Sequence, residues 1–254
     1  NFVLFSVNSE PTEVIPRWNL GVFGSTATEA DKGTYLPRGS AVLLHVEGSP
    51  NKYAITAGHI LSDSRTGDKP RWLKASWNTN RIVRSAKNKL GVKVIMDFYS
   101  SDRSLDLAVL EISGLEDEAE SHGIKILSKA EFSANLRNSA HGILFGWGLF
   151  NPEKDDFDTV RRPMVLRDVV MEMDSIVSGT KNRIFVCKSF DGRGPCQGDS
   201  GAPLVVIQGD EIKLAGIVLG KPDSGDLCHS EDFPTRFLAL SSVMKEIKKH
   251  IPGL

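Results

Sequence analysis

This chain has few cysteines, almost no net charge and no long apolar run. Only 3 of its 254 residues are cysteine, so at most one disulfide can form within the chain. Its 31 basic and 32 acidic residues leave a net charge of −1, so no long-range field favours nucleic acid or an anionic membrane. No stretch approaches the run of about 20 apolar residues that crosses a bilayer. We therefore expect neither nucleic acid nor a membrane as a partner.

Signatures of metal, redox and nucleotide chemistry are also missing. The chain has no His-Glu-x-x-His motif, no Cys-x-x-Cys pair and no glycine loop that ends in Lys-Ser or Lys-Thr. An acidic patch at Glu153, Asp155, Asp156 and Asp158 could hold Ca²⁺, but it lacks a recognisable loop signature, and we interpret it as solvated. We expect no metal and no cofactor.

The pattern of apolar residues predicts a single domain built mainly from strands. A chain of 254 residues with 40% hydrophobic content can bury a large core, and all-β barrels commonly reach this size as one unit. Gly, Pro, Asn and Asp separate short apolar runs at 41–46, 53–56, 92–96, 107–112, 142–145, 165–173, 184–186, 204–207 and 213–219. Near the end, Val243, Met244, Ile247 and Ile251 recur at helical spacing before Pro252 and predict a docked terminal helix.

The most informative motif is Cys196-Gln197-Gly198-Asp199-Ser200-Gly201-Ala202-Pro203. In acyl transfer, a serine nucleophile needs an adjacent base and two backbone N–H groups aimed at the oxygen that becomes negative. Flanking glycines permit backbone angles that a Cβ would resist. The motif therefore predicts Ser200 as the nucleophile, with the amides of Gly198 and Ser200 as the oxyanion hole. Read alone, Gly-Asp-Ser-Gly is equally typical of a polar turn.

Two other motifs decide between these readings. Thr56-Ala57-Gly58-His59 ends one apolar run, and Asp106 begins another. Taken singly, His59 could be a structural hydrogen-bonding residue and Asp106 a turn residue. Together with Ser200 they give the chain order His, Asp, Ser. This order differs from the order of the triad residues in subtilisins and in α/β-hydrolases.

In this order the three motifs resemble the chymotrypsin/trypsin family of serine peptidases. Gly146-Trp147-Gly148 is similar to the segment that opens the second half of the family domain. Residues 187–203 are similar to its specificity loop and nucleophile segment, and residues 241–250 to its C-terminal helix. The resemblance covers the chain from Gly39 to its end.

The resemblance implies an all-β fold of two antiparallel six-stranded β-barrels with a C-terminal α-helix, all within one peptidase domain over 1–254. It places an N-terminal segment at 1–38, the first barrel at 39–112, a linker at 113–123, the second barrel at 124–238 and the helix at 240–251. The active site would lie between the barrels. His59 would take the proton of Ser200 and return it to the leaving amine, while Asp106 stays ionised and orients His59. A protein or peptide would be the substrate.

The same alignment bounds the side chain that the primary specificity pocket accepts. It places Gly194 at the base of the pocket, where trypsins carry an aspartate, so we do not expect cleavage after Arg or Lys. The far wall would lie within 219–237, with Leu219 and Lys221 in the pocket. Lys221, His229 and Arg236 of this stretch could favour an acidic side chain, but the stretch also contains Asp223, Asp226 and Asp232. A medium apolar side chain is the first expectation, and an acidic one is the second.

The resemblance also predicts how the residues around the nucleophile are held. Cys196 and Cys228 match a disulfide near the specificity pocket, and Cys187 matches a half-cystine without a partner. Trypsin-type zymogens neutralise the aspartate that matches Asp199 with a new N-terminal ammonium, but no Ile-Val-Gly-Gly-like segment precedes Ser40. Asp199 therefore needs another cation, backbone donors or solvent, and we expect activation without the N-terminal switch, for example by loss of a propeptide.

Two questions stay open at this level. One disulfide slightly favours a secreted or periplasmic enzyme, while three reduced thiols in the cytosol are nearly as consistent with the composition. The functional alternative to a constitutively competent peptidase is a non-catalytic or partner-activated domain that serves as a binding module or a regulated effector.

Overall fold

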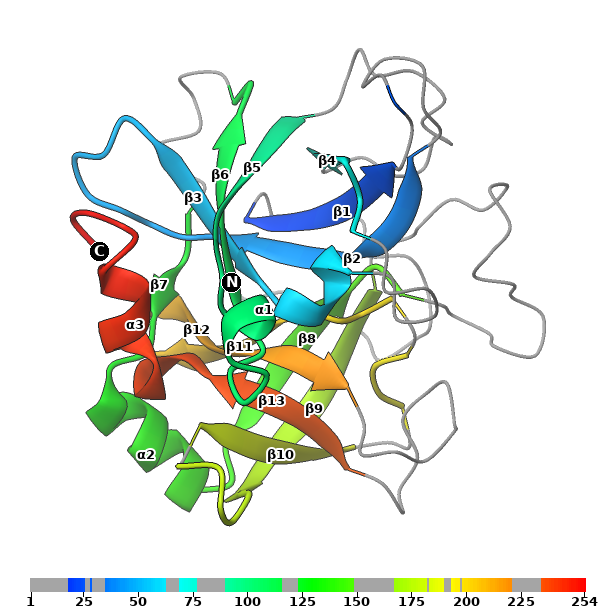
Figure 1. Cartoon of the computed structure of the whole chain (residues 1–254). Coiled ribbons are helices and arrows are strands. Elements are labelled where there is room, and N and C mark those ends of the chain that lie inside the picture. Colours follow the sequence, from blue (N-terminus) through cyan, green and yellow to red (C-terminus); the bar gives the residue numbers. More distant parts are fainter. Residues whose placement is uncertain are drawn as a thin grey trace.

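The computed structural model describes residues 18–25, 28, 35–62, 69–76, 90–115, 123–148, 167–181, 183–189, 193–196, 198–220 and 234–254. Strands are the main secondary structure of these residues. Figure 1 shows the strands of the first half of the chain in its upper part and those of the second half in its lower part. The two sets form separate barrels that pack against each other.

The first barrel is a closed ring of six antiparallel strands. Its strands are β1 (Asn19–Ser25), β2 (Leu36–Leu43), β3 (Lys52–Thr56), β4 (Trp72–Ser76), β5 (Leu90–Asp97) and β6 (Ala108–Ser113). They pair in the order β1-β2-β3-β6-β5-β4, and β4 returns to β1 to close the ring. Alternate residues point inward, so Ala41 and Leu43 of β2 lie in the barrel core, while Val42 lies in a different core.

The second barrel has the same six-stranded antiparallel construction. It contains β8 (His141–Gly146), β9 (Arg167–Ile176), β10 (Ile184–Ser189), β11 (Pro203–Gln208), β12 (Glu211–Gly220) and β13 (Thr235–Ala239). The order is β11-β8-β9-β10-β13-β12, and the β11–β12 pairing closes it. The short strand β7 (Lys125–Ile126) adds to β12 in parallel. The predicted fold class of two six-stranded barrels is therefore confirmed.

A third core joins the two barrels. It combines side chains from the outer faces of first-barrel strands, such as Val42 and Ile55, with second-barrel residues such as Val205 and Ile217. The buried side-chain amide of Asn19 also donates a hydrogen bond of 3.0 Å to the carbonyl oxygen of Phe145. Burial of apolar surface across this boundary stabilises one arrangement of the barrels, and that arrangement fixes any site built from both.

One predicted boundary differs from the structure. The first barrel begins at Asn19, inside the N-terminal segment predicted over 1–38, and not at Gly39. The missed strand β1 has the sequence Asn-Leu-Gly-Val-Phe-Gly-Ser, and all of its residues are buried. Its two glycines weaken the strand signal, and burial on both sides removes the apolar–polar alternation that marks a strand. Most of the predicted linker over 113–123 lies outside the described residues.

The helices in the described part of the chain are short. The predicted C-terminal helix is present as a 3-10 turn η4 (Leu240–Ser242) followed by α3 (Met244–Lys248), which is shorter than the predicted 240–251. Sequence patterning missed α2 (Lys129–Arg137), whose single buried side chain is Phe132. None of the described helices has the length and apolar character that a membrane span requires.

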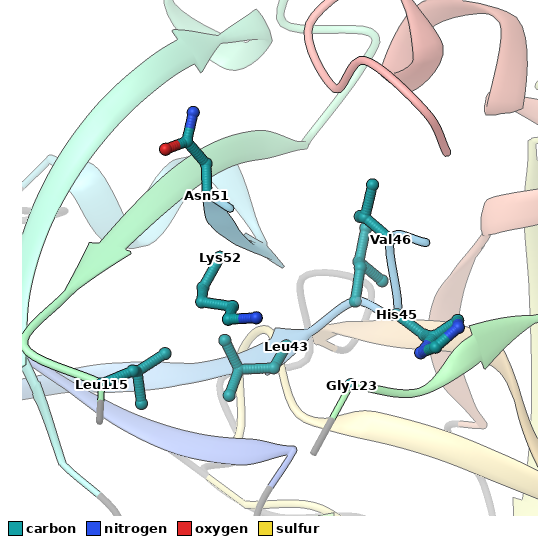
Figure 2. Close-up of a pocket in the computed structure, with 8 residues that line it drawn as sticks. Leu43, His45, Val46, Asn51, Lys52, Leu115 and Gly123 are labelled. Carbon is teal, nitrogen blue, oxygen red and sulfur yellow. The ribbon is translucent and has the colours of Figure 1, made fainter. Parts of the chain in front are cut away.

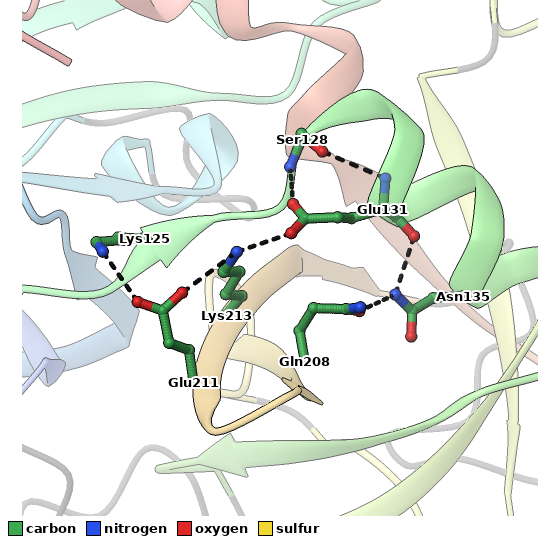
Figure 3. Close-up of polar contacts among 7 residues, drawn as sticks. All are labelled: Lys125, Ser128, Glu131, Asn135, Gln208, Glu211 and Lys213. Atoms are coloured by element: carbon green, nitrogen blue, oxygen red, sulfur yellow. Dashed lines mark hydrogen bonds and ion pairs between the residues drawn. The ribbon is translucent and has the colours of Figure 1, made fainter.

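A capping box and an ion-pair network hold α2 on the β11–β12 hairpin (Figure 3). The Ser128 hydroxyl accepts from the amide of Glu131, and the Glu131 carboxylate accepts from the amide of Ser128. The same carboxylate pairs with the Lys213 ammonium at 2.7 Å. The hydrogen bond from Lys213, with those from Ser128, lowers the pKa of Glu131 to about 2. The signal Ser-x-x-Glu before Phe132 is what could have predicted this helix.

Candidate active site

His59 lies in the 3-10 turn η1 (Gly58–Leu61) directly after β3, and Asp106 lies just before β6. Because β3 and β6 are antiparallel neighbours, with Thr56 opposite Ala108, the end of one meets the start of the other. The His59 amide donates to Asp106 Oδ1 at 2.8 Å, and Nδ1 of its ring lies 2.6 Å from Oδ2. Both carboxylate oxygens are therefore occupied by the same histidine, which fixes the orientation of its ring.

The other ring nitrogen of His59 faces the second barrel. Its Nε2 lies 2.8 Å from the hydroxyl oxygen of Ser200, which is 141 residues away in the chain. The structure thus brings the three predicted residues His59, Asp106 and Ser200 into one hydrogen-bonded row. The His59 side chain is 29% exposed and that of Asp106 is 17% exposed. The histidine is therefore accessible to solvent, while the carboxylate of Asp106 is more sheltered.

The first barrel also holds the main chain of the nucleophile. The amide of Ser40 on β2 donates 2.8 Å to the carbonyl oxygen of Ser200, and the Ser40 carbonyl accepts 2.6 Å from the hydroxyl of Thr56. Gly201 adopts φ +81°, and a Cβ there would overlap the Ser40 carbonyl oxygen and the Thr56 hydroxyl. Gly39 is equally tight, because a Cβ on it would come 2.6 Å from the Ser200 carbonyl oxygen. Sequence reasoning assigned no role to Ser40 or to the hydroxyl of Thr56, although Thr56 begins the histidine motif.

The backbone around Ser200 leaves two amides for a ligand. Gly198 is buried with φ +97°, a conformation that L side chains rarely adopt. The amides of Asp199, Gly201 and Ala202 donate to backbone carbonyls, whereas, within the described part of the chain, those of Gly198 and Ser200 have no acceptor. These are the two amides that the sequence predicts as the oxyanion hole.

Asp199 is buried beneath the nucleophile turn and is held by backbone donors. Its Oδ1 accepts from the amide of Gly148 at 2.7 Å, and its Oδ2 accepts from the amide of Cys196 at 2.8 Å. Removal from water raises the pKa of Asp199 from 3.8 to about 6, and the two amides oppose this rise. No cation pairs with Asp199 among the residues that the structure describes.

The Gly-Trp-Gly segment forms the wall against which Asp199 packs. A Cβ on Gly146 would overlap Asp199 Oδ1, and a Cβ on Gly148 would come 2.7 Å from the carboxyl carbon. Trp147 between them is buried in the core that joins the barrels. The two glycines thus allow the close approach that lets a backbone amide replace a cation.

The predicted specificity residues are only partly described. Gly194 is half-buried beside the buried Pro195, and half-buried Leu219 packs against both the interface core and the core of the first barrel. Lys221 lies outside the described residues, and the specificity assignment of all three stays a prediction. Cys196 is disulfide-bonded, while its predicted partner Cys228 lies outside the described residues.

The structure also describes Cys187, which lies in β10, while the acidic patch at 153–158 and His229 lie outside the described residues. Cys187 is free and fully buried in the second barrel, and burial raises the pKa of its thiol well above 9.0. Within the described residues, no cluster of His, Cys, Asp or Glu has the arrangement of a metal site.

A separate pocket lies on the first barrel, where β2 ends and β3 begins (Figure 2). It is shallow and is lined by Leu43, Leu44, His45, Val46, Asn51, Lys52, Leu115 and Gly123. None of these residues belongs to the row of His59, Asp106 and Ser200 or to the nucleophile turn. We therefore assign the candidate active site to His59, Asp106 and Ser200 between the barrels and not to this pocket.

Two β-barrels that share a His-Asp-Ser row define the class of two-barrel serine hydrolases. The Trypsin family model matches residues 48–245, so the chain belongs to the trypsin family and carries a trypsin-like serine protease domain. It is similar to human transmembrane protease serine 5, with 26% identity over 180 residues. That match covers 66% of this chain and 38% of the relative, so the chain spans less than half of that protein's length.

Proposed function

We propose that this protein is a serine endopeptidase that hydrolyses peptide bonds through an acyl-enzyme intermediate. The observation that carries the proposal is the contact of 2.8 Å between His59 Nε2 and the Ser200 hydroxyl, aligned with the contact of 2.6 Å between His59 Nδ1 and Asp106. This geometry gives a weak nucleophile its base and gives the base an orienting carboxylate. Membership of the trypsin family supports the same chemistry.

Each group has a defined task in this mechanism. Ser200 Oγ attacks the carbonyl carbon of the scissile bond while its proton passes to Nε2 of His59. Nδ1–H of the resulting imidazolium donates to Asp106 Oδ2, and the negative carboxylate stabilises the positive ring without taking its proton. The imidazolium then protonates the leaving amine. A water molecule, deprotonated by His59, releases the acyl group and restores Ser200.

The developing negative charge on the carbonyl oxygen needs donors that are already in place. The amides of Gly198 and Ser200 fit this task, since both are without an acceptor in the described part of the chain. Fixed donors of this kind lower the barrier because they need no reorganisation during the reaction, and one such donor contributes roughly 10²–10³ in rate.

We further propose that the active conformation does not need an N-terminal ammonium against Asp199. The amides of Gly148 and Cys196 occupy both oxygens of its carboxylate, and hydrogen bonds from backbone amides stabilise a buried carboxylate without a cation. Loss of a propeptide or binding of a partner remains the means of activation in this proposal.

The proposed substrate is a protein or peptide, with a medium apolar side chain in the primary pocket and an acidic one as the second choice. Gly194, which the alignment puts at the base of that pocket, supplies no negative charge for Arg or Lys. A fluorogenic peptide library tests this choice, and cleavage confined to bonds after Arg or Lys would contradict it.

Labelling with a fluorophosphonate tests the mechanism directly, because the reagent reacts only with a serine whose base and oxyanion donors are in place. We expect the wild-type protein to be labelled at Ser200 and Ser200→Ala not to be labelled. Ser175→Ala is the matched control, because Ser175 is exposed and, among the described residues, its hydroxyl donates only to the neighbouring Asp174. Ser200→Ala should retain the wild-type unfolding transition while peptide hydrolysis falls by several orders of magnitude.

The same assay separates the proposal from its alternative. Absence of labelling in a folded wild-type protein would refute a competent enzyme and favour a binding module or an inactive resting state. Labelling that appears only after proteolysis or addition of a partner would show that the protein is a regulated peptidase that needs activation.

A further inference from the structure

Two residues at the start of β1 join the first barrel to the end of β8 in the second barrel. The side-chain amide of Asn19 donates to the carbonyl oxygen of Phe145 at 3.0 Å, across 126 residues of chain. The ring of Trp18, the preceding residue, meets the Phe145 ring edge-on with 5.4 Å between the ring centroids. One polar contact and one aromatic contact therefore fix the two barrels to each other at Phe145.

The stability of the fold does not explain an asparagine at this position. The side chain of Asn19 is fully buried, and among the described residues its Oδ1 has no hydrogen-bond partner. A buried oxygen without a donor costs at least as much free energy as a typical hydrogen bond contributes. The gain from the bond to Phe145 is thus offset within the same side chain. An apolar side chain of similar size would suit the apolar core between the barrels equally well.

The strand end that Asn19 holds leads directly to Asp199. Phe145 lies three residues before Gly148, whose amide donates to Asp199 Oδ1 at 2.7 Å. The segment packs directly against the carboxylate, because a Cβ on Gly146 would come 2.0 Å from the same oxygen. A small displacement of the segment towards Asp199 produces overlap, and a displacement away from it lengthens the hydrogen bond. The position of residues 145–148 therefore sets the position of the carboxylate.

Asp199 lies between the two amides that form the proposed oxyanion hole. Its neighbours in the chain are Gly198 and Ser200, whose amides have no acceptor in the described part of the chain. The carboxylate of Asp199 is anchored from inside the protein by the amides of Gly148 and Cys196. The point at which it is anchored orients the peptide units on both sides of Asp199, and these units carry the two amides.

The strand pair β1–β2 also holds the other side of the nucleophile turn. The amide of Ser40 on β2 donates to the carbonyl oxygen of Ser200 at 2.8 Å. Ser40 lies opposite Gly21 of β1, two residues from Asn19. The same two strands therefore reach the turn by two routes, directly from Ser40 to Ser200 and indirectly from Asn19 through the end of β8 to Asp199.

We propose that Asn19 is a positioning residue for the proposed oxyanion hole. Through Phe145 it fixes the segment that holds Asp199, and Asp199 aligns the amides on either side of it with the carbonyl oxygen of the substrate. The proposal rests on the proposed function and concerns a residue that touches no reacting atom. A misplacement of about 1 Å at a catalytic group costs about 10²-fold in rate, so the loss of one distant hydrogen bond is enough to lower turnover.

Two substitutions that remove the amide donor test this role. Asn19→Leu keeps the size of the side chain, and Asn19→Ala forces no larger group into the core. The contact between Trp18 and Phe145 remains in both and supports the docking of the barrels. Val42→Ala is the matched control, because Val42 lies opposite Asn19 on β2, is buried in the core between the barrels and carries no hydrogen-bonding group in its side chain.

Three quantities are measured for each protein: kcat and KM for a fluorogenic peptide, the midpoint of urea unfolding, and hydrogen exchange of the Gly148 amide. We expect both Asn19 variants to lower kcat by roughly 10- to 100-fold with KM unchanged, because an oxyanion hole acts in the transition state. The Gly148 amide should exchange faster than the change in global stability explains. Asn19→Leu should keep the urea midpoint of the wild type. Val42→Ala should lower the midpoint and keep the kcat of the wild type.

Several results would overturn the proposal and leave the proposed function standing. These are an unchanged kcat in the Asn19 variants, an equal fall of kcat in Val42→Ala, and a fall of kcat without faster exchange at Gly148. Loss of folding in both Asn19 variants would make Asn19 a structural residue and would also overturn it. Absence of fluorophosphonate labelling in the wild type refutes the proposed function itself, and exchange at Gly148 then still tests the link from Asn19 to Asp199.

Discussion

Replacing Asp199 by Asn should remove a pH dependence of stability that the wild-type protein carries. The wild-type carboxyl has its pKa raised from 3.8 to about 6 because it is buried, and hydrogen bonds from two backbone amides oppose this rise. The folded state therefore binds the proton more tightly than the unfolded state does. The stabilisation linked to this proton is complete below about pH 4 and is lost as the pH rises through about 6.

The magnitude follows from the two pKa values. The interval from 3.8 to about 6 corresponds to about 3 kcal/mol of unfolding free energy, since each pKa unit is equivalent to about 1.4 kcal/mol. The Asn variant has no such titration. Its amide nitrogen faces one of the two backbone N–H donors, which adds a cost of roughly 1–3 kcal/mol that does not vary with pH.

Urea unfolding of both proteins between about pH 4 and 7.5 measures this effect. Other carboxylates, such as Glu131, titrate alike in both proteins and cancel in the difference. We expect the unfolding free energy of the wild type, minus that of Asp199→Asn, to fall by about 3 kcal/mol as the pH rises through this window. A difference that stays constant with pH would refute the inference that Asp199 is a buried carboxylate held by amides alone.

Three further predictions concern the triad, the nucleophile turn and the helix α2. Asp106→Asn should slow fluorophosphonate labelling and lower peptide hydrolysis by roughly 10⁴, because the amide favours the wrong tautomer of the histidine; wild-type turnover would contradict the assignment. Gly201→Ala should destabilise the fold by at least about 2 kcal/mol and abolish labelling, since its φ and the Ser40 carbonyl leave no room for a Cβ; an unchanged melting curve would count against it. Glu131→Gln should cost about 1 kcal/mol in urea unfolding at pH 7 by removing the Lys213 pair. This cost should vanish as the pH falls from about 4.5 towards 2, with catalysis unaffected throughout.

The motifs predicted the residues of the candidate site because each of these residues lies in a short segment with a recognisable pattern. Glycines around Ser200 mark backbone angles that few other residues adopt, and Gly198 and Gly201 do have positive φ. The order of His59, Asp106 and Ser200 pointed to one family and thus to two barrels. Most strands of those barrels were visible as short apolar runs between turn residues.

Elements without such a local signal were missed. Strand β1 is buried throughout and contains glycines, so neither alternation nor propensity identifies it. Helix α2 buries only Phe132 and is held by its capping box and by Lys213, so its apolar periodicity is weak. The short helix α1 (Phe98–Ser101) carries no motif, and the contact of its Tyr99 ring with the His59 ring depends on the close approach of α1 to η1.

The sequence by itself determined which side chains are chemically suited to acyl transfer, because nucleophile, base and glycine turn are properties of local segments. Only the tertiary structure decided that these groups meet. His59 and Ser200 belong to different barrels, and the apolar core between the barrels, with the hydrogen bond from Ser40 to Ser200, brings them within 2.8 Å. The partners of Asp199 were likewise settled only in three dimensions, because backbone amides are present at nearly every position and packing alone selects the two that reach a buried carboxylate.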